Sequence, residues 1–370
     1  MVKLSKTQTH RPDFILLAAV SVLVLFGLLM IYNASPVTSL RDFGDPLHLI
    51  RFQAGWAVVG IFLGAIIYWL PYTIWQKIAP FIIIFALGLL LAVLIPGLGV
   101  KVYGAQRWLS LGFVGIQPAE FIKLSYVIYL AALFARKVRF TPFLLITAAI
   151  AAIVLVQKDM GTTIIITFIG LVLYFIAGGA FWHIAALVPV LAALASVFIL
   201  TSGYRKARLL AFLNPAIDPQ GISYHLNQVL IALGSGGLFG VGLGESRQKY
   251  GYIPEVTTDS IFAVVGNELG FIGATFFIVV FLLLIFRGFK IAVAAPDKFG
   301  QLVAAGITAW LGFQAFINLA GLAALLPLTG VPLPFTSYGG SSLVATLVAV
   351  AILLNISRYT KVGASADRKH

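Results

Sequence analysis

An aspartate stands at the start of one of the longest apolar stretches of the chain. Asp259 follows Thr257 and Thr258, and the residues from about 260 to 286 are mostly apolar. If that stretch crosses a membrane as a helix, the carboxylate lies at the membrane surface, where it can accept a proton from a hydroxyl group. The alternative is that Asp259 only caps the helix N-terminus, with Thr257 or Thr258 as rivals. The two roles are compatible.

A second pair of ionisable residues follows a loop that contains Arg107. Glu120 and Lys123 come just after Gln117 and Pro118, at the start of another apolar stretch. At spacing i and i+3 they share one face of a helix. One interpretation is an ion pair whose lysine reaches back toward the surface. The other is a cation that faces a substrate in a cavity, because ionisable residues within a membrane are usually functional.

The remaining candidates lie in short polar intervals. Asp159 follows Lys158 between two apolar runs, where it either caps the next helix or takes part in a site. Translocated loops normally carry few basic residues, yet the intervals assigned to the outer side carry many. We therefore predict an anionic ligand there, bound by basic residues drawn from Arg107, Arg205, Arg208, Arg247 and Lys249.

Four further expectations concern Asp259 and segments elsewhere in the chain. Nearby Arg247 and Lys249 should keep the carboxylate ionised by lowering its pKa. Glu268, nine residues later, falls on the opposite helix face and is expected to brace helix packing. The glycine-rich segment 234–244 matches no phosphate-binding motif, so a packing role is favoured. The Pro- and Gly-rich segment 327–342 cannot continue a helix and is expected to line a cavity, with a simple outer turn as the alternative.

The composition identifies the class of protein that carries these residues. The chain has 370 residues, 61% of them hydrophobic and 10% charged, with a mean hydropathy of +1.03. Such values belong to integral membrane proteins. Apolar runs of about 20 residues, enough to cross roughly 30 Å of hydrocarbon, lie at about 14–33, 52–71, 79–97, 118–135, 142–157, 161–178, 182–201, 260–286, 301–325 and 340–357. We predict an all-α, single-domain membrane protein (1–370) of about ten helices, with a large outer loop at about 202–258 between helices 7 and 8.

Charge distribution orients these helices. With the N-terminus inside, the inner segments collect basic residues that include Lys3, Lys6, Lys361, Arg368 and Lys369, as the positive-inside rule requires. Both termini are then cytoplasmic, and nearly all acidic residues fall on the outer side. The chain has no cysteine, which excludes disulfides and thiolate metal sites. No soluble basic domain is available for nucleic acid.

Several sequence motifs resemble those of one family. The chain contains GAQRWLSLG, QPAEFIK, KDMGT, GGLFGVGLGESRQKYGYIPEVTTDSIFAVVGNELGFIGA and GVPLPFTSYGGSS. In order and spacing they resemble the SEDS family (shape, elongation, division and sporulation) over nearly the whole chain, and the stretch RQKYGYIPE is more similar to the division branch. Departures are Thr258 for the usual His, Ala119 for Ser, Lys158 for Pro and Asn267 for an acid; they bear on supporting contacts rather than on Asp259.

The resemblance implies a function and a site. SEDS proteins are ten-helix glycosyltransferases of the bacterial inner membrane, which polymerise lipid II into peptidoglycan strands at the outer face. It further implies a class B penicillin-binding protein as partner, together with other division or elongation membrane proteins. The family's essential aspartate falls on Asp259, and the polar residues of its other motifs fall on Glu120, Lys123 and Asp159.

The reaction would need a base and a site for the departing pyrophosphate. Asp259 suits the base, and the leaving group would be met by Arg205, Arg208, Arg247, Lys249 or Lys123. Arg208 and Arg247 are preferred because guanidinium binds phosphate through two donors. A divalent cation, Mg or Mn, held by Asp159 or Glu120 is the alternative. Two other functions stay open: a lipid II flippase and a non-catalytic scaffold for division proteins.

Overall fold

The structure is a computed structural model, which describes residues 10–102, 105–110, 112, 115–249 and 251–360. Lys3, Lys6, Lys361, Arg368 and Lys369, which contributed to the predicted orientation, lie outside the described residues. The cytoplasmic placement of the two termini therefore stays a prediction.

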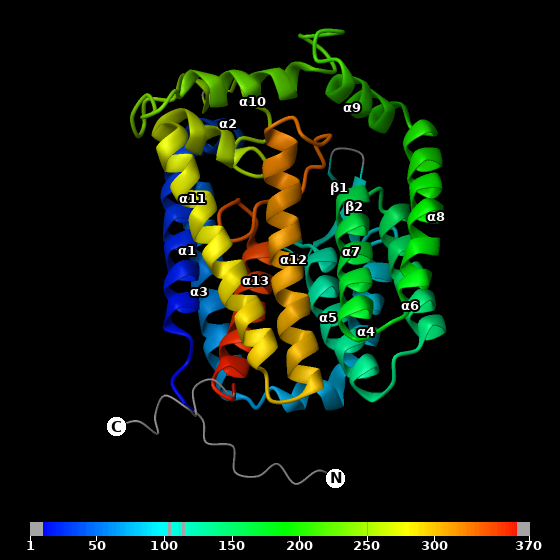
Figure 1. Ribbon diagram of the computed structural model, residues 1–370. Helices are drawn as coiled ribbons and strands as arrows, with labels where there is room; N and C mark the ends of the chain where they lie inside the picture. Colours follow the sequence, from blue (N-terminus) through cyan, green and yellow to red (C-terminus); the bar gives the residue numbers. More distant parts are fainter. Residues whose placement is uncertain (1–9, 103–104, 111, 113–114, 250, 361–370) are drawn as a thin grey trace.

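Ten long apolar helices form the body of the described chain, and each corresponds to one of the predicted ranges (Figure 1). Eight have at least 18 residues and are apolar enough to cross a membrane. The other two, α6 and α7, are also apolar but have 17 residues each. The ten are α1 (Phe14–Ala34), α3 (His48–Trp69), α4 (Thr73–Ala92), α5 (Pro118–Arg136), α6 (Phe140–Val156), α7 (Met160–Ile176), α8 (Phe181–Leu200), α11 (Ile261–Ala294), α12 (Lys298–Leu322) and α13 (Gly340–Ser357).

The start of α4 differs from its predicted position. The helix begins at Thr73, six residues before the predicted start at 79, and carries Pro80 in its interior. Its first turns contain Gln76 and Lys77, which lower the local hydropathy and so hide the helix start from an apolar-run criterion. Helix α11 likewise extends beyond its predicted end at 286.

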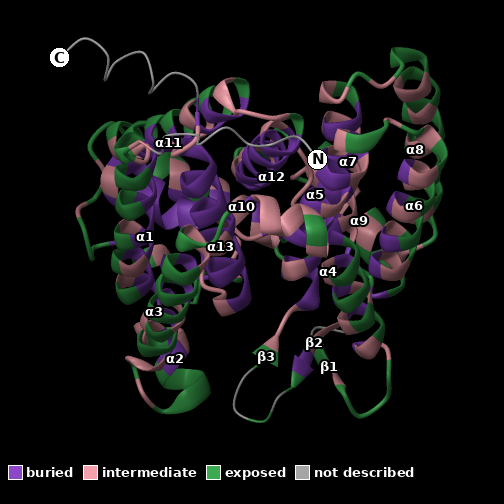
Figure 2. Ribbon diagram, turned by 90° about the horizontal axis from the view of Figure 1, so that it is seen from below, coloured by how far each residue is buried: buried purple, intermediate pink, exposed green. Residues whose placement is uncertain are grey.

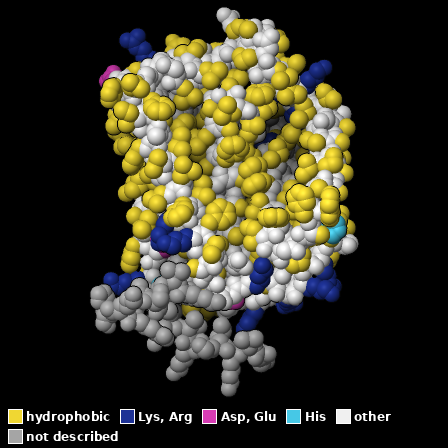
Figure 3. Space-filling model, viewed as in Figure 1, with side chains coloured by type: hydrophobic (Ala, Val, Ile, Leu, Met, Phe, Trp, Pro, Cys, Tyr) yellow, Lys and Arg dark blue, Asp and Glu magenta, His cyan; other side chains and the backbone are white. Residues whose placement is uncertain are grey.

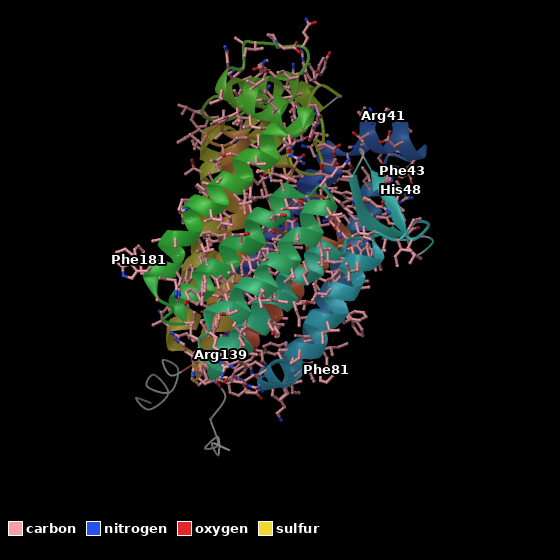
Figure 4. The ribbon with its side chains drawn as sticks, turned by 90° about the vertical axis from the view of Figure 1, so that its right-hand side faces the viewer. Arg41, Phe43, His48, Phe81, Arg139 and Phe181 are labelled. Carbon is pink, nitrogen blue, oxygen red and sulfur yellow. The ribbon has the colours of Figure 1, made fainter. Side chains whose placement is uncertain are left out.

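Smaller elements gather at one end of the bundle, at the top of Figure 1, which we call the outer end. They are α2 (Pro36–Phe43), α9 (Gly203–Leu213), α10 (Tyr224–Ser235) and the 3-10 helix η1 (Arg247–Lys249). Helices α9 and α10 both lie within the large outer loop predicted at about 202–258. In Figure 4, Arg41, Phe43 and His48 mark the outer end and Arg139 the opposite, inner end.

A small antiparallel sheet corrects the prediction of a purely helical chain. Strands β1 (Gly99–Val102), β2 (Ala105–Ser110) and β3 (Gly115–Ile116) pair in the order β1-β2-β3. The register places Gly99 opposite Leu109 and Val100 opposite Trp108. Arg107 was predicted to lie in a loop but lies on strand β2. The hairpin is attached to the end of α4, because Gln106 Nε2 donates a hydrogen bond to Val93 O at 2.8 Å.

The core of the bundle is formed by α5, α12 and α13. Buried residues make up 72%, 78% and 89% of their most apolar segments, while α8 has no buried residue. Figure 2 shows the purple central helices and the mostly green and pink α8 at one edge. A helix that is apolar on every side yet unburied faces lipid. On the face shown in Figure 3, hydrophobic side chains cover the middle, and Lys and Arg lie mainly toward the two ends.

Helix α11 is interrupted near its outer end, where the glycine-rich segment 234–244 packs against it. Gly270 has φ 65° and ψ −166°, a backbone conformation open only to glycine. A Cβ on Gly240 would lie 2.1 Å from Glu268 O. Four backbone N–H groups donate across the contact: Val241 to Asn267 O, Gly242 to Glu268 O, Phe271 to Gly237 O and Ile272 to Leu238 O, at 2.9 to 3.1 Å. The predicted packing role of these glycines is confirmed.

Candidate active site at the outer end

Asp259 immediately precedes α11 and does not cap it. The N-cap position belongs to Ser260, and no side chain makes a capping hydrogen bond there. The Asp259 backbone carbonyl accepts a hydrogen bond from Asn318 Nδ2 at 2.7 Å, which ties the residue to α12. The Asp259 carboxylate therefore does not cap α11, and the hydrogen bond from Asn318 to the Asp259 backbone carbonyl fixes the position of the residue.

The carboxylate lines a small cleft between α12 and the connection that leads from α12 to α13. The other lining residues are Ile317, Asn318, Gly321 and Leu322 of α12, and Leu328, Thr329 and Gly330 of the connection. Segment 327–342 is non-helical up to α13, and its first residues line this cleft, as predicted. The connection keeps its place because Asn318 Nδ2 donates to Val331 O and Gln314 Nε2 donates to Pro332 O, each at 2.8 Å.

Arg208 of α9 comes close to Gly330, a residue that lines the cleft together with Asp259. Its Nη1 donates to Leu328 O at 2.9 Å, and its guanidinium lies over the Tyr204 ring. A Cβ on Gly330 would lie 3.4 Å from Asp259 Oδ2 and 3.6 Å from Arg208 Nη1. The two charged groups thus face the same glycine, and a larger side chain at position 330 would stand between them.

Burial controls the protonation of Asp259. Its surroundings raise the pKa of the carboxyl to about 7, with burial as the main cause and the negative charge of Glu255 as the second; Arg208 opposes the shift. The expectation of a lowered pKa was wrong, because desolvation outweighs the nearby positive charge. Thr258 Oγ1 donates to Glu255 Oε2 at 2.9 Å and lies 3.4 Å from Asp259 Oδ1.

A histidine that the sequence did not single out completes this side of the site. His225 of α10 forms a hydrogen bond with Ser260 Oγ at 2.7 Å. Burial, followed by the charge of Arg208, lowers the pKa of His225 to about 4. The imidazole is therefore neutral at physiological pH and adds no positive charge to the site.

A second polar cluster lies on the other side of the α12–α13 connection. Asp159 caps α7: Oδ1 accepts from Thr162 N and Oδ2 from Thr162 Oγ1, both at 3.0 Å. Arg107 Nε lies 3.8 Å from Asp159 Oδ2, and its Nη2 donates to Lys158 O. A Cβ on Gly161 would lie 3.4 Å from Thr329 O. Thr329 and Gly330 thus bring the Asp159 and Asp259 clusters next to each other.

The Glu120 and Lys123 pair is buried in the core of the bundle. Lys123 Nζ donates to Glu120 Oε1 and to Gln314 Oε1, each at 2.8 Å, and lies 5.2 Å from the centre of the Trp310 ring. Both side chains are at most 2% exposed. The ion-pair interpretation is confirmed, but its lysine does not reach to the surface. Through Gln314, Lys123 instead supports the α12–α13 connection.

The other basic candidates do not converge on Asp259. Lys249 Nζ is buried and donates to Glu268 Oε1 at 3.2 Å and to Asn33 Oδ1 at 2.6 Å, so it links η1 to α11 and α1. Its predicted contact with substrate is corrected to a structural ion pair, and Glu268 has the predicted bracing role. Arg205 Nε donates to Phe198 O. Arg247 is exposed on η1.

The donor set does not fit a metal ion held by the protein alone. No three His, Asp or Glu side chains converge within the described part of the chain. Both carboxylate oxygens of Asp159 accept hydrogen bonds in the first turn of α7, and Glu120 is paired with Lys123. A divalent cation at either residue stays a prediction, and no step of the mechanism below depends on one.

Fold and site together define a polytopic membrane protein with a carboxylate in a cleft at one end of its helix bundle and a guanidinium beside that cleft. The comparison with known families gives this class a name. Residues 13–362 match the model of the FtsW, RodA and SpoVE family, described as cell cycle proteins. Because the match covers nearly the whole chain, the chain belongs to this family.

Individual relatives agree with this assignment. The chain is 38% identical over 363 residues to stage V sporulation protein E of Bacillus subtilis, covering 96% of this chain and 99% of that protein. It is 40% identical over 363 residues to the probable peptidoglycan glycosyltransferase FtsW of Thioalkalivibrio sulfidiphilus, covering 95% and 90%. Among solved structures, a chain of a peptidoglycan synthase complex that coordinates polymerization and crosslinking matches with a TM-score of 0.78 at 27% identity, covering 94% of this chain and 98% of that one.

Proposed function

We propose that this protein is a peptidoglycan glycosyltransferase that polymerises lipid II at the outer face of the bacterial inner membrane. Its relatives carry the name of that activity, and the family match covers residues 13–362. The observation that supports the proposal most directly is Asp259, a carboxyl with a pKa of about 7 that lines a cleft and approaches Gly330 together with Arg208. A general base works best when its pKa lies near the operating pH.

The chemistry is an inverting displacement. The 4-hydroxyl of one GlcNAc unit gives its proton to the ionised Asp259 carboxylate while its oxygen bonds to the anomeric carbon of a second unit's MurNAc. The bond from that carbon to the pyrophosphate oxygen breaks, and its electron pair leaves with undecaprenyl pyrophosphate. Asn318 and the packing of α11 hold Asp259 in place, so that its position does not have to be established during the reaction.

Arg208 is the first choice for the negative charge that develops on the leaving group. Its Nη1 is bonded to Leu328 O, which leaves further N–H donors of the planar guanidinium for phosphate oxygens. Arg107 is the second choice, because it lies beyond Thr329 on the adjoining cluster and its side chain is 31% exposed. Asp259 and Arg208 would then act on opposite ends of the reacting bond.

A class B penicillin-binding protein is the expected partner. The structural relative described above comes from a complex that coordinates polymerization and crosslinking. In the present chain, the base and the cations described around the cleft suit glycosyl transfer. Strand crosslinking would therefore fall to a separate transpeptidase.

The test is polymerisation of labelled lipid II by the purified protein, alone and with its cognate class B penicillin-binding protein. Wild type should give glycan ladders on a gel, and Asp259→Asn should give none while retaining lipid II binding. Asp218→Asn, which replaces an exposed outer-loop aspartate, is the matched control and should polymerise normally. No ladder from wild type with the partner confirmed bound would instead support lipid II transport or a scaffold role, and a fully active Asp259→Asn protein would exclude Asp259 as the base.

A further inference from the structure

Two amide side chains on α12 face the α12–α13 connection. Only one of them has hydrogen-bond partners within the protein for both its amide nitrogen and its amide oxygen. Gln314 and Asn318 lie one helical turn apart, are 0% and 5% exposed, and each donates through its amide nitrogen to a backbone carbonyl of the connection. Gln314 Oε1 accepts from Lys123 Nζ and Trp310 Nε1, each at 2.8 Å. Asn318 Oδ1 is buried and has no hydrogen-bond partner.

The orientation of the Asn318 amide follows from its neighbours. Its Nδ2 lies 2.7 Å from Asp259 O and 2.8 Å from Val331 O. Both of these atoms can only accept hydrogen bonds, so the nitrogen must face them and a flipped amide would place oxygen against two carbonyl oxygens. The acceptor Oδ1 is therefore held on the remaining side of the amide.

Asn318 lines the same cleft as Asp259. Of the side-chain atoms that are buried without a partner in the described chain, Asn318 Oδ1 alone belongs to a residue of this cleft. A buried amide oxygen without a donor is unfavourable, and most such atoms in proteins are paired. A ligand that enters the cleft with an O–H or N–H group can supply the missing donor.

We propose that Asn318 is a substrate-binding residue, whose Oδ1 accepts a hydrogen bond from a sugar hydroxyl or acetamido N–H of the acceptor unit. This inference rests on the proposed function and extends it: the 4-hydroxyl meets Asp259, while a neighbouring donor of the same sugar meets Asn318. One side chain would thus fix both the base, through Asp259 O, and the sugar that the base acts upon.

The experiment removes the hydrogen-bond donor from the substrate and the hydrogen-bond acceptor from the protein, singly and together. Lipid II analogues that lack the 3-hydroxyl, the 6-hydroxyl or the acetamido N–H of GlcNAc serve as glycosyl acceptors for wild type and for Asn318→Ala. Labelled lipid II is the glycosyl donor. We expect wild type to discriminate against one analogue by roughly three- to tenfold in kcat/KM, the range of a neutral hydrogen bond. Asn318→Ala should lose this discrimination although its overall rate is also lower.

The control is Asn355→Ala at the inner end, where a buried asparagine donates to Tyr68 O and accepts from Tyr72 N. It removes a comparable buried amide and should keep the wild-type discrimination. If Asn318→Ala proves too unstable to turn over, equilibrium binding replaces turnover as the readout. Binding of the same analogues is then compared between the Asp259→Asn variant and a double variant that combines Asp259→Asn with Asn318→Val, which has no acceptor in its side chain. The double variant lacks the amide oxygen and should bind all the analogues without discrimination.

The outcomes separate this inference from the proposed function. Ladders from wild type establish polymerisation whatever happens at Asn318. Equal discrimination by wild type and Asn318→Ala, or no discrimination by wild type among the three analogues, would overturn the substrate contact and leave Asn318 with the positioning of Asp259 only. Absence of wild-type polymerisation would overturn the proposed function, and this inference with it.

Discussion

At the scale of single residues, Asp259 shows how a membrane-surface carboxylate is tuned by its surroundings. Burial and Glu255 raise its pKa to about 7, while Arg208 pulls in the opposite direction. A raised pKa means that the ionised carboxylate costs stability in the folded protein, and it also brings the carboxyl into the range that the proposed base requires. Thr258, which stands where the family usually has His, contacts Asp259 and Glu255 but brings no charge.

The pH dependence of activity follows from this carboxyl. Because the base must be ionised, kcat/KM of wild type should rise with pH through an apparent pKa near 7. Arg208→Gln removes a charge that lowers the pKa, so its profile should shift to higher pH. Initial rates of lipid II polymerisation between about pH 5.5 and 8.5 measure both. A profile that is flat, or one that Arg208→Gln leaves in place, would contradict the assignment; Asp218→Asn should match wild type.

At the scale of elements, the interruption of α11 explains how a rigid helix delivers a residue to the outer surface. The glycine-rich segment pairs with the backbone on both sides of Gly270, which fixes the outer part of α11 and Asp259 just before it. Beneath this contact, Lys249 and Glu268 join η1 to α11, and Asn33 adds α1. The elements around the site are therefore positioned by backbone pairing and one buried ion pair.

Gly270→Ala should destabilise the protein by at least about 2 kcal/mol, because a Cβ would be forced into a glycine-only backbone conformation. That Cβ would also lie 2.3 Å from Gly240 N and 2.6 Å from Leu238 O. Thermal unfolding in detergent measures the effect. Gly88→Ala in α4, whose Cβ would meet no atom within 4 Å, is the control and should be neutral or slightly stabilising. Equal unfolding temperatures for the two variants would refute the packing argument.

Lys249→Met should destabilise the protein by about 3 to 5 kcal/mol, because it leaves the Glu268 carboxylate buried without its cation. Adding Glu268→Gln removes the unpaired charge and should recover much of the loss. A double-mutant cycle on the free energy of unfolding measures the coupling. Additive effects of the two substitutions would show that the pair is not coupled.

At the scale of the whole molecule, the outer end holds the site and the inner end is bound together by separate polar contacts. Asp13 pairs with Arg287, and Tyr72 Oη donates to Asp297 at 2.5 Å. These contacts join α1 to α11 and the α3–α4 connection to α12, far from Asp259. The candidate site and these polar contacts thus lie at opposite ends of the helix bundle.

The absence of cysteine allows this orientation to be measured directly. Gln220→Cys lies in the outer segment before α10, and Arg139→Cys lies at the inner end between α5 and α6; both positions are exposed. In spheroplasts, a membrane-impermeant maleimide should label Gln220→Cys and should label Arg139→Cys only after permeabilisation. Labelling of Arg139→Cys in intact spheroplasts would reverse the assigned orientation.

The sequence by itself determined the helical membrane architecture, because twenty-residue apolar runs have few other stable arrangements in lipid. It also identified Asp259, whose position before an apolar helix and whose motif both pointed to the same residue. Local rules offered the Asp159 cap and the Glu120–Lys123 pair as one of two interpretations each, since both depend on residues three positions apart, and the structure shows both contacts.

Only the tertiary structure decided which distant residues meet. Lys249 and Arg208 were both candidates for binding the leaving group, but the fold buries Lys249 against Glu268 and places Arg208 near Gly330. The pKa of Asp259 was predicted in the wrong direction because burial, which outweighs nearby charge, arises from packing between α11, α12 and the connection that follows it. The sequence did not single out Asn318. Its role depends on the backbone carbonyl groups of Asp259 and Val331, which only the fold places beside its amide.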